Sequence, residues 1–157
     1  MASIVRNLIE YSGLADYLPS DAVAFKQFNV EENLCLPCQK PDIEQIVKVM
    51  AEVVIKSTRV IKTPKAISLE GQKLTGWKLI IEGEVKQKIE YVADEPEQSV
   101  HAAHFNVPFS TFIVLPEHFK IGTPIDVTGY IEDIFVQQLN KRCMFKNITI
   151  LLDAEFC

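Results

Sequence analysis

Apolar and polar residues alternate along most of the chain from Phe25 onward. The clearest stretch covers residues 77–92, with the sequence WKLIIEGEVKQKIEYV, where apolar side chains occupy most of the odd-numbered positions and charged side chains fill most of the even-numbered ones. A period of two with one apolar and one charged face is typical of a half-buried antiparallel strand. Residues 105–116 and 124–136 repeat the pattern, and residues 143–154 are rich in β-branched side chains. We therefore predict strands in all four segments.

Residues 41–61 fit two patterns. Their sequence, PDIEQIVKVMAEVVIKSTRVI, places apolar residues at helical spacing and also at every second position. The high content of Val and Ile favours a strand from about Ile46, because β-branched side chains pack better on a pleated sheet than on a helix. Turn signals built from Gly, Pro, Asn and Asp separate these segments. The pattern predicts a mainly β chain, folded as a single antiparallel β-sandwich-like domain.

The N-terminal segment follows a different pattern. Residues 3–12 predict a short amphipathic helix with Ser3 as its N-cap, and a turn-like stretch follows through residues 19–21. We therefore divide the chain into an N-terminal arm, residues 1–23, and a β domain with a C-terminal cysteine tail, residues 24–157. The apolar side of the arm needs a partner, which we expect to be a neighbouring subunit. The arm residues expected to make this contact are Ile4, Val5, Leu8 and Ile9.

Composition and charge exclude several classes of partner. The chain has 157 residues and a net charge of −5, and no run of Lys and Arg is longer than two, so we expect no nucleic-acid partner. No stretch approaches the roughly 18 apolar residues of a membrane span, so we expect no membrane partner. The N-terminus has no apolar core or cleavage site typical of a signal peptide. We expect synthesis in the cytoplasm without export by that route.

The chain lacks the motifs of common enzymes. It has three histidines but no Gly-x-Ser-x-Gly elbow, and its six glycines form no phosphate-binding loop. His101 and His104 would point to opposite faces of a strand and could not easily share a metal ion. We expect no enzymatic activity, no catalytic residues and no cofactor.

The cysteines are the unusual feature. Cys35 and Cys38 form a Cys-x-x-Cys pair in a Pro-containing loop, Cys143 opens the last predicted strand, and Cys157 is the final residue. The first pair could supply half of a zinc site, but the second half lacks a matching short spacing. Redox catalysis, free thiols and disulfides are the other interpretations. We assign no metal ligands, keep Cys35 and Cys38 as the zinc alternative, and treat all four cysteines as candidate cross-linking residues, Cys157 being well placed to reach a neighbour.

Several blocks, in order, resemble the SPOCS domain of spore coat and exosporium-associated proteins of clostridia and their relatives. They are FKQFNVEENLCLP, KPDIEQIVKVMAEVVI, LEGQKL, IEYVA, SVHAAHFNVPFSTFIVLP and RCMFKNITILL, and the similarity runs from Phe25 to about Ala154. The resemblance implies a structural or morphogenetic module of sporulation and provides no catalytic residues. The chain departs from the family pattern in the Cys35–Cys38 pair and in Cys157. The resemblance also implies that a protein made in the mother cell reaches an oxidising exterior after lysis, where disulfides persist.

These observations predict a self-assembling structural protein of the bacterial endospore surface, in a coat or exosporium layer or in a filament or appendage. Arm docking, strand-edge contacts and intermolecular disulfides would join its subunits, so we expect as partners copies of the chain itself and other spore coat or exosporium proteins. The alternative is a monomeric recruitment module of the coat, which binds another coat protein or carries zinc through its cysteines.

Overall fold

The computed structural model describes residues 2–157, and within that range the chain forms strands and connecting loops and no helix. No helix of the described chain is therefore long and apolar enough to cross a membrane. The mainly β prediction is confirmed. The strands are Ala2–Arg6 (β1), Ile9–Leu14 (β2), Ala24–Cys35 (β3), Ile43–Lys62 (β4), Ala66–Ile67 (β5), Lys73–Leu74 (β6), Trp77–Ala93 (β7), Val100–Val114 (β8), Ile125–Gln138 (β9) and Cys143–Phe156 (β10).

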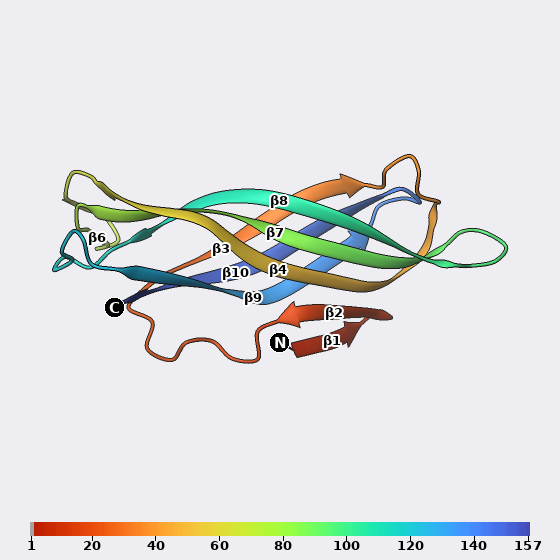
Figure 1. Cartoon of the computed structure of the whole chain (residues 1–157), viewed down its shortest axis with the longest axis horizontal. Coiled ribbons are helices and arrows are strands. Elements are labelled where there is room, and N and C mark those ends of the chain that lie inside the picture. The colour runs from red at the N-terminus through yellow and green to blue at the C-terminus, as the bar shows by residue number, and fades with distance from the viewer. Residues whose placement is uncertain (1) are drawn as a thin grey trace.

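Two sheets form the sandwich (Figure 1). The larger has the strand order β1-β2-β4-β7-β8 and the smaller the order β3-β10-β9, while β5 and β6 form a separate hairpin. All pairings are antiparallel except that of β2 with β4, which is parallel. The long strands run along the long axis of the molecule; the 17 residues of β7 alone span about 55 Å at strand rise.

The core lies between the central strands of the two sheets. In β7 the odd-numbered residues from Leu79 onward are buried, including Ile81, Val85 and Ile89, each with no more than 1% of its surface exposed. In β10 the even-numbered residues face them, including Ile148 and Ile150. The alternation in the sequence thus arises because each strand has one face in the interior and one face in solvent.

The predicted N-terminal helix is wrong. Residues 2–14 form a β-hairpin whose two-residue turn, Asn7 and Leu8, has positive φ angles of 50° and 68°. The hairpin joins the large sheet because β2 pairs with β4. Its position is fixed further by a hydrogen bond from the Ala15 amide to the Ile131 carbonyl, 2.9 Å long.

Close backbone approach explains how the hairpin fits against β4. Gly13 has a φ of +104°, and a Cβ atom at this position would lie 2.1 Å from the carbonyl oxygen of Ala51. Only glycine allows β2 to approach β4 this closely. The strand prediction for residues 41–61 is confirmed, and β4 begins at Ile43, slightly before the predicted start.

Candidate functional site

Two of the four cysteines form a disulfide within the chain. Cys35 is the last residue of β3 and Cys143 the first of β10, and the two lie directly opposite each other in the antiparallel register. They form a disulfide that closes a sequence separation of 108 residues. In this structure these residues therefore pair with each other rather than with a neighbouring subunit.

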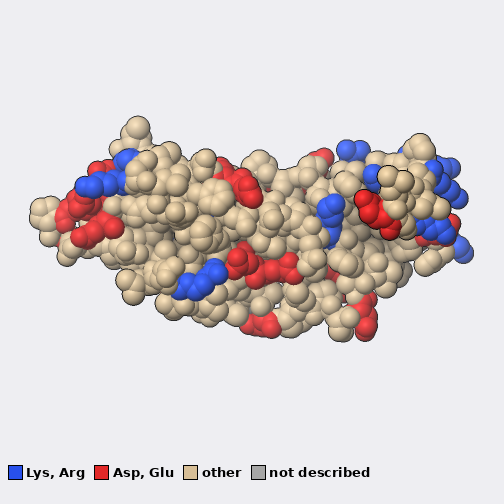
Figure 2. All heavy atoms as spheres, turned by 180° about the vertical axis from the view of Figure 1, so that it is seen from behind, with Lys and Arg blue, Asp and Glu red and all other residues tan. Residues whose placement is uncertain are grey.

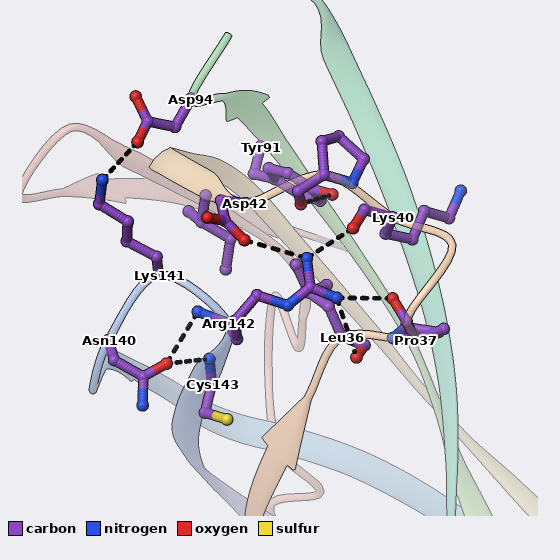
Figure 3. A network of polar contacts seen from close by, with 12 residues as sticks. Leu36, Pro37, Lys40, Asp42, Tyr91, Asp94, Asn140, Lys141, Arg142 and Cys143 are labelled. Carbon is purple, nitrogen blue, oxygen red and sulfur yellow. Dashed lines mark hydrogen bonds and ion pairs between the residues drawn. The ribbon is translucent and has the colours of Figure 1, made fainter.

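The loop after Cys35 is held by Arg142, which precedes the other half of the disulfide (Figure 3). Figure 3 shows the guanidinium group pointing into this loop. It donates hydrogen bonds to the carbonyl oxygens of Leu36, Pro37 and Lys40, and it forms an ion pair with the Asp42 carboxylate, 3.2 Å away. A planar group with five donors suits such a convergence of oxygen atoms. The loop that carries Cys38 is thus bound to the start of β10.

Further polar contacts strengthen this end of the sandwich. The Asn140 side-chain oxygen accepts hydrogen bonds from the backbone amides of Arg142 and Cys143, both 2.8 Å long. The Tyr91 hydroxyl donates to the Pro41 carbonyl over 2.8 Å, and partial burial of this hydroxyl raises the pKa of Tyr91. These contacts place Cys38 on an ordered support.

Cys38 and Cys157 are free and exposed. The backbone amide of Cys157 donates to the Pro124 carbonyl over 3.1 Å, and its thiol donates to the Asp126 carboxylate over 3.4 Å. This hydrogen bond and the negative charge of Asp126 raise the pKa of the Cys157 thiol. Asp126 therefore keeps this thiol protonated to a higher pH than usual and lowers its reactivity near neutrality.

The two free thiols lie at opposite ends of the small sheet. Cys38 is three residues beyond Cys35, which faces the first residue of β10, and Cys157 directly follows β10. The 14 residues of β10 span about 45 Å. Figure 1 shows the β3–β4 loop and the C-terminus at opposite sides of the view. Because a disulfide needs Cα atoms within about 7 Å, these two thiols cannot pair within one chain.

The zinc alternative loses one of its two ligands. Cys35 is bonded to Cys143 and does not offer a thiolate. In residues 2–157 no three or more His, Cys, Asp or Glu side chains are grouped so that they could hold a metal ion. His101 stacks on Tyr91 with ring centroids 6.0 Å apart, whereas His104 is exposed on the other face of β8.

The four arm residues divide between surface and core. Ile4 and Val5 lie on β1 with 41% and 71% of their surface exposed, and Leu8 in the turn is 80% exposed. Ile9 begins β2 and is buried in the core of its own chain. Three of the four residues are thus available to a partner, and Ile9 is not.

A buried polar cluster was missed from the sequence. Lys146 on β10 is 1% exposed, its ammonium lies 4.7 Å from the ring centre of Phe105, and burial lowers the pKa of this lysine to about 7. Glu32 faces Lys146 across the strand register, and Gln87 faces Phe105 in the other sheet. The Lys146 ammonium nitrogen and one side-chain oxygen each of Glu32 and Gln87 are buried without a hydrogen-bond partner. Lys146 occupies an inward position between Met144 and Ile148, a signal that alternation alone could have revealed.

The surface charge follows no single pattern. On the face shown in Figure 2, most Lys and Arg side chains gather at one end with Asp and Glu among them, and the remaining charged side chains form small groups with wide uncharged areas between them. This face offers no continuous basic area of the kind that binds a nucleic-acid backbone.

Comparison with known proteins identifies the central part of the chain. A family model described as SipL, SPOCS domain, matches residues 42–139. No curated protein and no solved structure matches the chain. The matched range is narrower than the resemblance noted above: it extends from just before β4 to just after β9 and contains none of the four cysteines. Because the match covers more than half of the chain, the protein belongs to the SipL, SPOCS domain family.

Proposed function

We propose that this chain is a self-assembling structural subunit of the endospore surface, located in the coat, the exosporium or an appendage. The SPOCS domain indicates a sporulation-related protein. The finer proposal rests on one observation: the two free, exposed cysteines lie at opposite ends of a long sandwich that is already cross-linked internally. No catalytic role is part of the proposal.

Two thiols at opposite ends make each subunit bifunctional. Formation of a disulfide between subunits joins two Sγ atoms, and each thiol gives up one proton and one electron. Dioxygen or a low-molecular-weight disulfide accepts the two electrons. Since Cys38 and Cys157 of one chain are too far apart to pair, every such bond joins separate subunits. A contact between different patches that does not close into a ring extends into a polymer.

The proposed location on the spore surface suits disulfide formation. Disulfides form and persist in oxidising surroundings and are rare in the cytosol. We place synthesis in the mother-cell cytoplasm and cross-linking on the spore surface after the mother cell lyses. Other coat or exosporium proteins with accessible thiols would be partners alongside further copies of the chain.

The test compares oxidised protein on reducing and non-reducing gels, with negative-stain microscopy of the same samples. The unmodified protein should give a ladder of covalent oligomers that disappears with reductant. Cys38→Ser and Cys157→Ser each leave one free thiol, so each variant should stop at a covalent dimer. The variant with both substitutions should give no covalent product. A ladder that persists in the double variant, or none in the unmodified protein, would overturn the proposal.

A second candidate function is a monomeric module that recruits another coat protein. The observation that favours it is the segment between β2 and β3, in which Tyr17 and Val23 are each 73% exposed and Leu18 is 42% exposed. A clean monomer on both gels, with no assemblies by microscopy, would favour this function. Replacing Tyr17 and Val23 with Ser should then abolish retention of the chain on spores while leaving it folded.

A further inference from the structure

The large sheet ends in two open edges, β1 on one side and β8 on the other. Its last strand, β8, has 15 residues and contains no Asp, Glu, Lys or Arg. Natural proteins usually protect a long edge strand with charges, bulges or a covering segment, because its free backbone groups can pair with another chain. Pro108 is the one interruption that the sequence of β8 provides.

Pro108 determines which residues of β8 face the open edge. It pairs with Glu84 inside a regular antiparallel register that has no shift. Since proline has no N–H group, Pro108 and Glu84 must form a pair without hydrogen bonds between them. Every second residue of β8, counted from Pro108, likewise makes no backbone hydrogen bond to β7. Ser110, Phe112 and Val114 therefore direct their N–H and C=O groups away from β7. Residues 110–114 form an unbroken run beyond Pro108, five residues long.

The strand at the opposite edge, β1, is as long as the run 110–114 of β8. β1 comprises five residues, and its two-residue turn makes Arg6 and Ile9 a hydrogen-bonded pair. By alternation, Ser3 and Val5 direct their backbone groups away from β2. Figure 1 shows β1 at the outer border of the molecule. The Arg6 guanidinium forms an ion pair with Asp133 on β9, 3.2 Å away, which fixes the strand against the other sheet.

Strand directions allow these two edges to meet in identically oriented copies. β1 is antiparallel to β2, β2 is parallel to β4, and β7 is antiparallel to both β4 and β8. It follows that β1 is antiparallel to β8. A second copy with the same orientation, moved sideways along the sheet, would present its β1 to β8 in the antiparallel sense.

We infer that β1 of one copy pairs with residues 110–114 of β8 in the next copy and extends the five-stranded sheet from subunit to subunit. The outward-directed residues of both strands also carry their side chains on the outer face of the sandwich, where Val5 is 71% and Phe112 36% exposed. The ammonium groups of Lys26 on β3 and Lys78 on β7 each lie 4.3 Å from the ring centre of Phe112, so a pairing strand would have to displace the flexible Lys26 side chain. Opposing residues in a ladder share a face. Among the possible registers, we choose the one that places an aromatic side chain opposite a β-branched one. In this register Val5 lies opposite Phe112 and Ser3 lies opposite Val114.

This inference deepens the proposed function and rests on it, but the two contacts have different directions. The strand contact adds subunits side by side, across the strands, whereas the free thiols lie at the ends of the long axis. Reductant breaks only the disulfides. The two proposals can therefore fail separately.

The test uses the Cys38→Ser, Cys157→Ser double variant, so that only noncovalent contacts remain, and follows association by sedimentation velocity. This protein should associate as its concentration rises. Val5→Pro and Phe112→Pro each remove one outward N–H without removing a bond inside the subunit, and each should weaken association by about tenfold or more. Asn106→Pro alters an outward position on the other side of Pro108 and serves as the matched control, with unchanged association. Far-UV circular dichroism checks that each variant remains folded.

Mixing the variants tests which edges meet. Val5→Pro retains an intact β8 edge and Phe112→Pro retains an intact β1 edge, so an equimolar mixture should form a heterodimer and no larger species. Pairing of β8 with β8 would instead leave Val5→Pro fully associating, which would overturn the inference. A double-serine protein that stays monomeric at every concentration would overturn it as well, while a disulfide ladder from the unmodified protein would still support the proposed function.

Discussion

The four cysteines fall into two sets, one joined by a disulfide and one with free thiols. Cys35 and Cys143 face each other across β3 and β10 and are joined inside the chain, whereas Cys38 and Cys157 are exposed at the two ends of the small sheet. The joined pair restrains the unfolded chain, and the free pair is available to other molecules. The same residue type thus occupies a cross-linked position and a free, exposed position that we propose for assembly, separated by only three residues in the case of Cys35 and Cys38.

Removal of the internal disulfide should have the largest effect on stability. The Cys35→Ala, Cys143→Ala variant loses a cross-link that closes a 108-residue separation, and its free energy of unfolding should fall by about 2–5 kcal/mol. Chemical denaturation measures this difference. The matched Cys38→Ala, Cys157→Ala variant should change stability by no more than about 0.5 kcal/mol. Equal losses in the two variants would contradict the division into a stabilising pair and two free thiols without a structural role.

The buried Lys146 should lower the free energy of unfolding, which is the opposite of the effect of the disulfide. The two lie three residue pairs apart in the register of β3 and β10. Burial lowers the pKa of Lys146 from 10.5 to about 7, so below about pH 7 the folded state bears the full cost of a buried charge. Between about pH 7 and 10.5 the unfolded state binds more protons, and stability should therefore rise with pH. Lys146→Met should raise the free energy of unfolding near neutral pH by about 1–4 kcal/mol and remove this rise.

Denaturation curves at several pH values measure the effect of Lys146, with the exposed Lys86→Met as the control. In the variant without the internal disulfide, Lys146→Met should recover part of the lost stability. A loss of stability in Lys146→Met at neutral pH would mean that the buried ammonium has partners that outweigh its desolvation.

Substitution of Arg142 should show how far this side chain, rather than the neighbouring disulfide, orders the loop at residues 36–42. Arg142→Met removes the hydrogen bonds to the loop at residues 36–42 and should reduce the free energy of unfolding by about 1–3 kcal/mol. Hydrogen exchange should become faster in this loop while β7 stays protected. Arg59→Met, at an exposed position of β4, is the matched control. Unchanged exchange in the loop would show that the disulfide and the remaining hydrogen bonds, such as that from Tyr91 to Pro41, order it without the Arg142 side chain.

Periodicity predicted the long strands because each has one face in the core and one in solvent. It failed in the N-terminal hairpin for a physical reason. Apolar residues at positions 4, 5, 8 and 9 match helical spacing, and the left-handed turn at Asn7 and Leu8 contains no glycine to mark it. The alternation of Ile9 and Tyr11, both buried in β2, is too short to outweigh that spacing.

The cysteine arrangement depends on strand order, which periodicity does not contain. Cys35 and Cys143 become neighbours only because β3 pairs with β10 in one particular register. The nearby Cys38 suggested a local pair instead. The separation of Cys38 from Cys157 likewise depends on the length and direction of β10, so their positions at opposite ends emerge only from the folded chain.

Substitution of Asp126 should have the smallest effect, a change in the reactivity of the Cys157 thiol alone. Its carboxylate raises the pKa of Cys157 through the hydrogen bond and its charge, so Asp126→Asn should lower that pKa. At a fixed pH near 8 a larger fraction of Cys157 would then be thiolate, and its alkylation by iodoacetamide should accelerate by a factor on the order of a few. Mass spectrometry of the alkylated peptides follows both thiols in one sample, and Cys38, which is remote from Asp126, should react at an unchanged rate. Equal acceleration at both cysteines would point to general loosening of the fold. Acceleration at Cys157 alone would mean that Asp126 lowers the reactivity of this thiol, and in the proposed assembly it would then slow cross-linking through Cys157.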